Sequence, residues 1–386
     1  MKIKSADAQA QPIRSQWGIP PWPPCTVGTC PFSGGRETYD VAIVGGGLTG
    51  NSVALHLARR GRRVVVFEAG RIGDGASGRS GGLVLEGTAR GTMEGASTCL
   101  EELARLVYDE ALECGLRLPG CWEIAHRPPV KFQPQLPWQD GGSPVSVVHT
   151  MAGGVVDPMA LVGGLAHAAI KAGAVIHENT PVRHLEYGTP ATLELDRGRV
   201  RAAHIVVALN AWSTALVPEL GAMGSALTLA CATAPVEDSL IEEIGLAAGI
   251  PFYTIDQPYL WGRLTMDRRI IFGAGLAWGE PEALEWLALE APAVEECFIR
   301  LEGRIRQLHP RLHDLGALTR WGGPISIPDR MTPIIGHLPE APHIFVAGGY
   351  SGHGVALSVH AGRLIAEAIT QGAALPKWGA PPRRNA

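Results

Sequence analysis

The sequence lacks the long apolar runs and the excess of basic residues that define several classes of protein. Its longest apolar runs have the length of a sheet strand, far below the roughly 20 residues of a transmembrane helix, so we expect no membrane span. The N-terminus carries two lysines but no apolar segment typical of a secretory signal. The net charge is −4, and the one basic cluster, residues 59–63, closes a predicted helix, where cations suit the helix dipole. We therefore expect no nucleic-acid partner.

The cysteines and histidines form no pattern that predicts a metal centre. The seven cysteines contain no Cys-x-x-Cys pair and are odd in number, which favours scattered reduced thiols in the cytoplasm. Cys25 and Cys30 form a Cys-x4-Cys pair, but without a second pair this is a poor zinc signal. The thirteen histidines contain no His-Glu-x-x-His motif, and the helical spacing of His309 and His313 is more typical of a surface or capping arrangement.

What the sequence does contain is a strand–turn–helix–strand pattern over residues 39–68. The apolar run 41–44 is typical of a strand buried on both faces of a parallel sheet. Three glycines follow at the spacing Gly-x-Gly-x-x-Gly, and a helical pattern then runs to Arg60. A second apolar run, 64–67, ends on an acidic residue.

This pattern predicts a dinucleotide-binding site. Gly45 allows a tight turn out of the strand, Gly47 lets the backbone approach a pyrophosphate, and Gly50 permits close packing of helix and strand. The helix N-terminus offers N–H groups and a partial positive charge to the phosphates. Glu68 lies 23 residues after Gly45, where a carboxylate binds ribose hydroxyls, and its charge argues against NADP. The motif by itself does not separate FAD from NAD, so an NAD-dependent dehydrogenase remains an alternative.

The next segment, residues 72–82, resembles the GASGRNGG segment of flavin amine oxidoreductases of the D-amino-acid oxidase/glycine oxidase superfamily, closest to the γ-glutamylputrescine oxidase-like branch. In that family the segment passes along the FAD pyrophosphate toward the flavin ring. Ser80 stands where the family usually has Asn, which shortens the reach of this contact.

Three later segments carry the same resemblance. Residues 178–182 resemble the return from the substrate domain to the FAD domain, where the backbone at the position of Val182 meets the adenine. Residues 208–212 resemble the family's A-x-N-A junction beside the cofactor. Residues 348–354 resemble its G-x-S-G-H-G turn, which feeds a helix whose N–H groups suit the negative charge of reduced flavin.

The resemblance implies an α/β plus β architecture: a discontinuous Rossmann-type FAD-binding domain with an inserted antiparallel-sheet substrate domain, as in glycine oxidase and D-amino-acid oxidase. We expect helices within 95–115, 159–171 and 292–308 and a last helix ending near residue 369. The expected FAD-binding domain comprises 39–90, 150–215 and 329–375, the substrate domain 91–149 and 216–328, a Pro- and Trp-rich arm 1–38, and a tail 376–386.

The cofactor implied is FAD, bound non-covalently. Family members with covalent flavin use a Cys in the C-terminal third or a His near the GASG segment. Here the last cysteine is Cys297, before the C-terminal signature, and no His lies between His56 and His126. The predicted cofactor-binding residues are Gly45, Gly47, Leu48, Thr49, Gly50, Glu68, Ala69, Ser77, Gly78, Arg79, Ser80, Gly81, Gly82, Val182, Asn210, Ala211, Trp212, Gly349, Tyr350, Ser351, Gly352, His353 and Gly354.

The resemblance also implies an activity: oxidation of a primary or secondary amine at the C–H next to nitrogen, with hydride transfer to flavin N5 and hydrolysis of the imine. The partners would be a small-molecule amine and O2 or another electron acceptor. The few lysines (2, 4, 131, 171 and 377) offer no match for the lysine thought to promote oxygen reactivity, so oxidase and dehydrogenase both remain open. The predicted substrate-pocket residues are Tyr253, Tyr259, Trp261, Arg263, Trp321 and Tyr350, and the candidates for a catalytic role are His353, Tyr259 and Trp321, each of which could equally be a core residue.

One absence bears on the substrate. Members that oxidise small α-amino acids commonly hold the carboxylate with an Arg just before the Asp-containing turn of the C-terminal signature. Residues 322–328, which precede Asp329, contain no Arg. We therefore expect an amine that is not a small α-amino acid. Arg263, Arg320 and Arg330 are possible substitutes, which keeps a glycine- or sarcosine-type enzyme as an alternative.

Two other classes compete with this interpretation. Residues 78–82 formally fit the Gly-x-Ser-x-Gly nucleophile elbow, which needs a strand before it and a helix after it. We expect a loop before it and a strand at 83–85 after it, so a serine hydrolase is disfavoured. A flavin-bearing accessory subunit without turnover of its own also remains open. The sequence does not indicate an oligomeric state.

Overall fold

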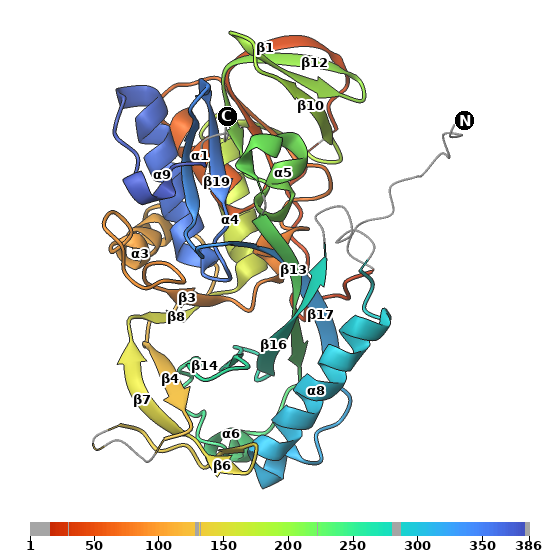
Figure 1. Cartoon of the computed structure of the whole chain (residues 1–386), viewed down its shortest axis with the longest axis vertical. Coiled ribbons are helices and arrows are strands. Elements are labelled where there is room, and N and C mark those ends of the chain that lie inside the picture. Colours follow the sequence, from red (N-terminus) through yellow and green to blue (C-terminus); the bar gives the residue numbers. More distant parts are fainter. Residues whose placement is uncertain are drawn as a thin grey trace.

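The computed structural model describes residues 16–29, 31–127, 131, 133–221, 223–279 and 287–382, so that Cys30 lies outside the described residues. The chain forms two lobes (Figure 1). The upper lobe contains a mostly parallel sheet with helices on one side, and the lower lobe contains a second sheet with the long helix α8 (Pro292–Leu308) beside it. No helix among the described residues is long and apolar enough to cross a membrane.

The upper sheet has the parallel core that the glycine motif predicts. Strand β1 (Gly35–Val44) pairs in parallel with β2 (Val64–Phe67) and β12 (Gly198–Val207). Val41 and Ile43 pack in one hydrophobic cluster and Ala42 and Val44 in another, so this strand is buried on both faces as expected. Strand β9 (Val175–His177) is parallel to β2, and β19 (Ala341–Gly348) is parallel to β12. The antiparallel strands are β18 (Ile334–Leu338), which pairs with β19, and β10 (Val182–Glu186) and β11 (Ala191–Leu195), which extend the sheet from β12.

Helices from three distant parts of the chain cover one face of this sheet. These are α1 (Leu48–Ala58), α4 (Pro158–Lys171) and α9 (Gly354–Gln371), and α3 (Cys99–Asp109) packs on α9 (Figure 1). Helix α4 begins where Asp157 accepts hydrogen bonds from the N–H groups of Met159 and Ala160 at 2.9 Å, with Pro158 in its first turn. The expected discontinuous Rossmann-type domain is confirmed.

The lower sheet has the strand order β17-β13-β16-β15-β14-β4-β7. Its face toward α8 and α6 (Asp238–Glu243) carries the apolar core of this lobe. The strands are β4 (Cys121–Ala125), β7 (Ser146–Met151), β13 (Met223–Ala232), β14 (Phe252–Thr254), β15 (Leu260–Leu264), β16 (Ile270–Gly279) and β17 (Thr319–Pro328). A two-stranded sheet of β3 (Leu83–Leu85) and β8 (Gly153–Val155) lies where the chain passes between the lobes (Figure 1).

Two details differ from the expectation. Strand β14 runs parallel to β4, whereas the other neighbours in the lower sheet are antiparallel. The two strands come from separate insertions of the chain, so no hairpin imposes their relative direction. Strand β1 also begins at Gly35, within the expected irregular arm, because residues 35–39 pair with residues 198–202 of β12.

The rest of the described arm is held against the lower sheet by backbone contacts. Trp17 is fully buried, and its carbonyl accepts a hydrogen bond from Gly322 N at 2.8 Å. The guanidinium of Arg79 donates to the carbonyls of Trp17, Gly18 and Gly322 at 3.3, 3.0 and 3.1 Å. The buried Trp17 therefore anchors the arm, and Arg79 ties the arm to strand β17.

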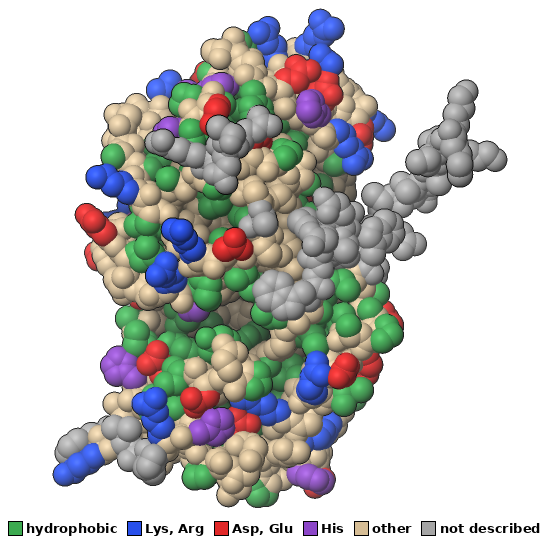
Figure 2. Space-filling model, viewed as in Figure 1, with side chains coloured by type: hydrophobic (Ala, Val, Ile, Leu, Met, Phe, Trp, Pro, Cys, Tyr) green, Lys and Arg blue, Asp and Glu red, His purple; other side chains and the backbone are tan. Residues whose placement is uncertain are grey.

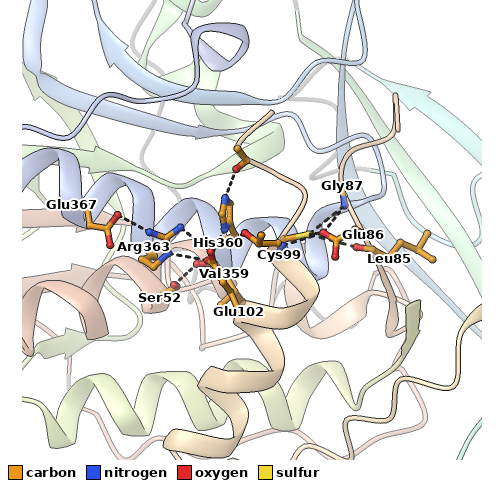
Figure 3. A network of polar contacts seen from close by, with 12 residues as sticks. Ser52, Leu85, Glu86, Gly87, Cys99, Glu102, Val359, His360, Arg363 and Glu367 are labelled. Atoms are coloured by element: carbon orange, nitrogen blue, oxygen red, sulfur yellow. Dashed lines mark hydrogen bonds and ion pairs between the residues drawn. The ribbon is translucent and has the colours of Figure 1, made fainter. Parts of the chain in front are cut away.

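A charged network joins α3 to α9 (Figure 3). Glu102 on α3 contacts His360 Nδ1 at 2.6 Å and accepts two hydrogen bonds from Arg363, each 2.9 Å long. His360 is 2% exposed. Burial alone would raise the pKa of Glu102, but the hydrogen bonds from His360 and Arg363 outweigh it and lower this pKa from 4.5 to about 2. The carboxylate is thus held in its charged form between the two helices.

We expect Glu102→Gln to destabilise the protein by roughly 2–4 kcal/mol, because it leaves His360 and Arg363 without their carboxylate. The folded-state pKa lies below the unfolded one, so this stability is fully present above about pH 4.5 and is lost as the pH falls toward 2. Urea unfolding at neutral pH and at about pH 3 measures both effects.

The matched control for this prediction is Glu367→Gln. Glu367 pairs with Arg363, four residues earlier on α9, at 2.6 Å and with Arg60 at 3.5 Å, and both pairs are partly exposed, so this loss should cost less than about 1 kcal/mol. Equal urea midpoints for the parent and Glu102→Gln, or a difference that stays constant down to pH 3, would contradict the assignment.

Candidate active site

The glycine turn after β1 is closed so tightly that side chains are excluded. Gly45 has φ +107°, a conformation that L residues rarely adopt, and a Cβ on it would lie 2.6 Å from the Ala208 carbonyl. A Cβ on Gly50 would lie only 1.9 Å from the Gly45 carbonyl. The two glycines therefore have the roles that the motif predicts, a sharp turn and close packing of α1 on the strand.

The N-terminus of α1 is left open for an anion. Its N-cap is Gly47, which offers no side-chain cap, and its first turn contains no acidic residue. Ser77 Oγ accepts a hydrogen bond from Leu48 N at 2.9 Å, so the segment that resembles GASGRNGG lies against this first turn. The N–H groups that follow Leu48 in the first turn and the positive end of the helix dipole suit a diphosphate.

Glu68, at the end of β2, accepts hydrogen bonds from Gly46 N at 2.7 Å and from Gly70 N at 2.9 Å. Burial raises the pKa of its carboxyl group, an effect that these two N–H groups oppose. The carboxylate therefore lies beside the glycine turn, where the motif predicts a contact with the ribose. Its two hydrogen bonds also join the loop after β1 to the loop after β2.

The other predicted cofactor segments meet at the same place. Asn210 Oδ1 accepts a hydrogen bond from Gly349 N at 2.9 Å, which joins the A-x-N-A junction to the C-terminal signature. The hydroxyls of Thr49 and Tyr350 lie 2.9 Å apart and connect the first turn of α1 to the turn before α9. Helix α9 also begins without a side-chain cap, at His353.

Three buried polar atoms test whether this region fits a cofactor. Ser80 Oγ, Trp212 Nε1 and His353 Nδ1 are buried and have no hydrogen-bond partner among the described residues. Buried polar atoms are nearly always hydrogen-bonded in native proteins, so three such atoms on predicted cofactor segments fit a polar ligand that reaches all three segments. Burial lowers the pKa of His353, which keeps this imidazole neutral.

A parallel α/β domain with an open glycine turn, joined to a second sheet, defines a dinucleotide-dependent oxidoreductase of the flavoprotein type. A family model described as "FAD dependent oxidoreductase", the DAO family, matches residues 40–368. The chain belongs to this family.

Individual relatives agree with this assignment. The chain is 29% identical over 379 residues to gamma-glutamylputrescine oxidoreductase of Escherichia coli (strain K12), covering 86% of this chain and 84% of the relative. It is 24% identical over 373 residues to glycine oxidase of Geobacillus kaustophilus (strain HTA426), covering 86% and 93%. The crystal structure of glycine oxidase from Geobacillus kaustophilus matches with a TM-score of 0.70 at 20% identity, over 91% of this chain and 100% of that chain, which concerns the fold alone.

The lower sheet turns a row of predicted pocket residues toward the cofactor domain. Tyr253 lies opposite Trp261 in the register of β14 and β15, and Trp261 lies opposite Gly273 of β16. A Cβ on Gly81 or on Gly273 would lie 2.1 or 2.0 Å from the Trp261 ring, so this indole is held between the two lobes. Figure 2 shows a hollow between the lobes, at the level where Figure 1 has β3 and β8 above and β14 below.

Other predicted pocket residues lie elsewhere. Trp321 is fully buried and donates to the Arg79 carbonyl at 3.0 Å, Tyr350 lies in the core of the upper lobe, and Tyr259 is 52% exposed at the start of β15. Arg320 donates to Glu302 at 2.6 Å and to Glu295 at 2.8 Å. Contacts of these four residues with a substrate therefore have no geometric support here.

The predicted cofactor residues also include some whose side chains do other work. Arg79 donates to the Asp74 carbonyl as well as to the arm, so we assign its guanidinium a structural role. Ala69 is exposed, and Val182 opens strand β10. The Gly-x-Ser-x-Gly alternative is wrong in its context, because the short helix α2 (Ala76–Arg79) precedes Ser80 and strand β3 follows.

Asn51 is a residue that sequence reasoning missed. Its Nδ2 donates to the Gly46 carbonyl at 2.7 Å and to the Gly47 carbonyl at 3.1 Å, which fixes the glycine turn from inside α1. Its Oδ1 is buried without a partner among the described residues. The sequence feature that could have indicated this role is a polar residue directly after Gly50, at a buried position of the helix where an apolar residue is expected.

We expect Glu68→Gln to weaken FAD binding by about 10-fold or more, because one charge-assisted hydrogen bond is worth roughly 1.5–3 kcal/mol. The FAD-free protein should also lose stability, since Gln keeps only one acceptor oxygen and its NH2 group cannot accept the second hydrogen bond from Gly46 N or Gly70 N. Fluorescence titration of the FAD-free protein measures the affinity, and thermal unfolding with and without FAD measures the stability.

Glu178→Gln is the matched control. Glu178 is 9% exposed and holds Ile72 N at 2.7 Å and Thr29 Oγ1 at 2.6 Å, but it is not a predicted FAD contact. This variant should lose stability while its FAD affinity changes by less than about 3-fold. Parent-like FAD affinity of Glu68→Gln would refute the placement of the ribose.

Proposed function

We propose that the chain binds FAD non-covalently across the meeting point of α1, α2 and the turn before α9. The N–H groups at the start of α1 would face the diphosphate, Glu68 the ribose, and the segment 80–82 the flavin. The turn 349–354 and the neutral His353 would lie at the pyrimidine side of the flavin, where the N-terminus of α9 stabilises negative charge. The unpartnered Ser80 Oγ, Trp212 Nε1 and His353 Nδ1 support this arrangement.

We propose that the reaction is the oxidation of a primary or secondary amine at the C–H next to nitrogen. FAD, when bound, supplies the acceptor for the hydride equivalent at flavin N5. The observation that carries the proposal is the family membership, together with the sheet face that brings Trp261 against Gly81. Relatives named gamma-glutamylputrescine oxidoreductase and glycine oxidase act, by their names, on amines.

The task of the protein in this proposal is to orient the amine and to exclude water. Trp261 and Tyr253 offer an apolar wall at the sheet face. Tyr253 donates to Glu123 Oε1 at 2.6 Å, and burial, followed by this carboxylate, raises its pKa, so the phenol stays protonated and acts as a donor. The proposal needs no side-chain base.

The substrate that we propose is an amine other than a small α-amino acid. Residues 322–328 contain no Arg, and Arg320, one possible substitute, is already paired with Glu295 and Glu302. A glycine- or sarcosine-type activity and an accessory subunit without turnover are the competing proposals. A cytoplasmic location and O2 or another acceptor complete the proposal, and they rest on the cysteine pattern and on the family resemblance.

The substrate class is tested by following flavin bleaching under anaerobic conditions, which makes the identity of the acceptor irrelevant. Putrescine-like and N-alkyl amines should bleach the flavin faster than glycine, sarcosine and D-alanine, since no arginine stands at the usual carboxylate position. Faster bleaching by the small amino acids would overturn this substrate class. Bleaching by none of the amines would favour the accessory-subunit alternative.

The non-covalent attachment is tested by acid precipitation, after which the yellow colour should stay in the supernatant. Cys297, the last cysteine, lies on α8 and packs in the core of the lower lobe on the far face of the sheet, which supports this expectation. Colour that remains in the precipitated protein would overturn it.

A further inference from the structure

Arg263 is a buried cation whose guanidinium lies over the ring of Trp22 but has no acceptor among the described residues. It lies on β15, two residues after Trp261, and is only 5% exposed. It makes no hydrogen bond or ion pair with any described residue, and its Nε is fully buried. Arg79 is buried to the same degree, 4% exposed, but backbone carbonyls take up its donors. A guanidinium that has lost its water without gaining acceptors points to a ligand that supplies them.

A pocket of ≈ 290 Å³ lies next to this guanidinium. One wall is the N-terminal arm, where the ring of Trp22 lies 5.9 Å from Arg263 Cζ. The opposite wall is the β15–β16 hairpin, and the floor comes from the residues around the start of α4. The lining includes the ring of Trp22 and the charged side chains of Arg117, Asp157, Arg263 and Asp267.

The charged side chains around the pocket give it a net positive charge. Arg117 is exposed, and its side chain likewise makes no hydrogen bond or ion pair with a described residue. Asp267 accepts from Arg269 Nε at 2.7 Å, so its charge is already compensated. Asp157 remains, and its Oδ1 caps α4. Two cations thus face one carboxylate that is already engaged by a helix N-terminus.

Arg263 keeps its charge despite its burial. Burial lowers its pKa to about 10, while Asp157 raises it and Arg117 lowers it further. At neutral pH the guanidinium is therefore protonated, and its donors can form charge-assisted hydrogen bonds.

We propose that Arg263 and Arg117 form a binding site for the carboxylate of a small organic molecule, with Trp22 and the neighbouring prolines of the arm as its wall. A planar guanidinium matches a carboxylate with two parallel hydrogen bonds. One negative charge balances the site, whereas the presence of Asp157 opposes a dianion such as phosphate. A second pocket of ≈ 300 Å³ shares Arg117, Thr265 and Met266, so a longer molecule has room to extend.

The carboxylate has two possible sources, a separate ligand or the far end of the amine substrate. Arg263 lies close to Gly82, since a Cβ there would be 2.9 Å from Arg263 Nη2, and Gly82 ends the segment that we place along the flavin. The second source rests on the proposed function, while binding itself does not.

The test is calorimetric titration of the FAD-loaded full chain with butyrate, inorganic phosphate and chloride at constant ionic strength. Butyrate should bind saturably and more tightly than the other two. Arg263→Gln and Arg117→Gln should each weaken butyrate binding by about 10-fold or more, since each removes a charged donor. Arg300→Gln, which removes an exposed arginine of α8 that lines neither pocket, should leave it unchanged.

The source of the carboxylate is distinguished by KM and kcat for 6-aminohexanoate and hexylamine, which differ in the distal carboxylate. If the substrate supplies it, Arg117→Gln raises KM for 6-aminohexanoate alone and leaves kcat unchanged. If a separate molecule supplies it, both KM values stay the same while butyrate binding is lost. Absence of saturable butyrate binding, tighter binding of phosphate, or equal binding by the parent and Arg117→Gln overturns the proposal. Arg117 is exposed, so this variant remains informative even if Arg263→Gln does not fold.

Discussion

The close approach of helix α1 to the glycine turn is the constraint on which the rest of the site depends. Only hydrogen atoms fit between Gly50 and the Gly45 carbonyl, so the helix starts directly beyond the strand and its first N–H groups point out of the turn. Ser77 and Tyr350, which are far apart in the chain, form hydrogen bonds with the first turn of this helix. Asn210 follows Ala208, whose N–H donates to the carbonyl of Val44 at the end of the strand that enters the glycine turn. A bulkier residue at Gly50 would separate all of these segments at once.

The features that the sequence predicts well are those that follow from local patterns. The buried strand 41–44 and the helix 292–308 appear where the apolar pattern indicates them. The direction of β14 relative to β4 could not be predicted, because no short connection links the two strands. The start of β1 at Gly35 could not be predicted either, because residues 35–38 form a strand through their pairing with β12 and have no strand pattern of their own.

The site shows a similar division. The glycines, Glu68 and Ser77 lie together as their motifs suggest, whereas the arginines could not be sorted from the sequence. Arg79 and Arg263 are equally buried, yet one is saturated by carbonyls and the other makes no hydrogen bond with a described residue. Arg320 is held by two glutamates of α8. The role of an arginine depends on which acceptors the folded backbone brings to it, and that information is non-local.

The contact between the arm and strand β17 affects the order in which parts of the chain can fold during synthesis. During synthesis residues 16–18 are made about three hundred residues before Gly322, whose N–H and carbonyl hold them through Trp17 and Arg79. At roughly 5–20 residues per second, the arm waits at least about fifteen seconds without its binding surface. The buried indole of Trp17 is therefore solvent-exposed on the nascent chain, and the arm is among the last segments to dock.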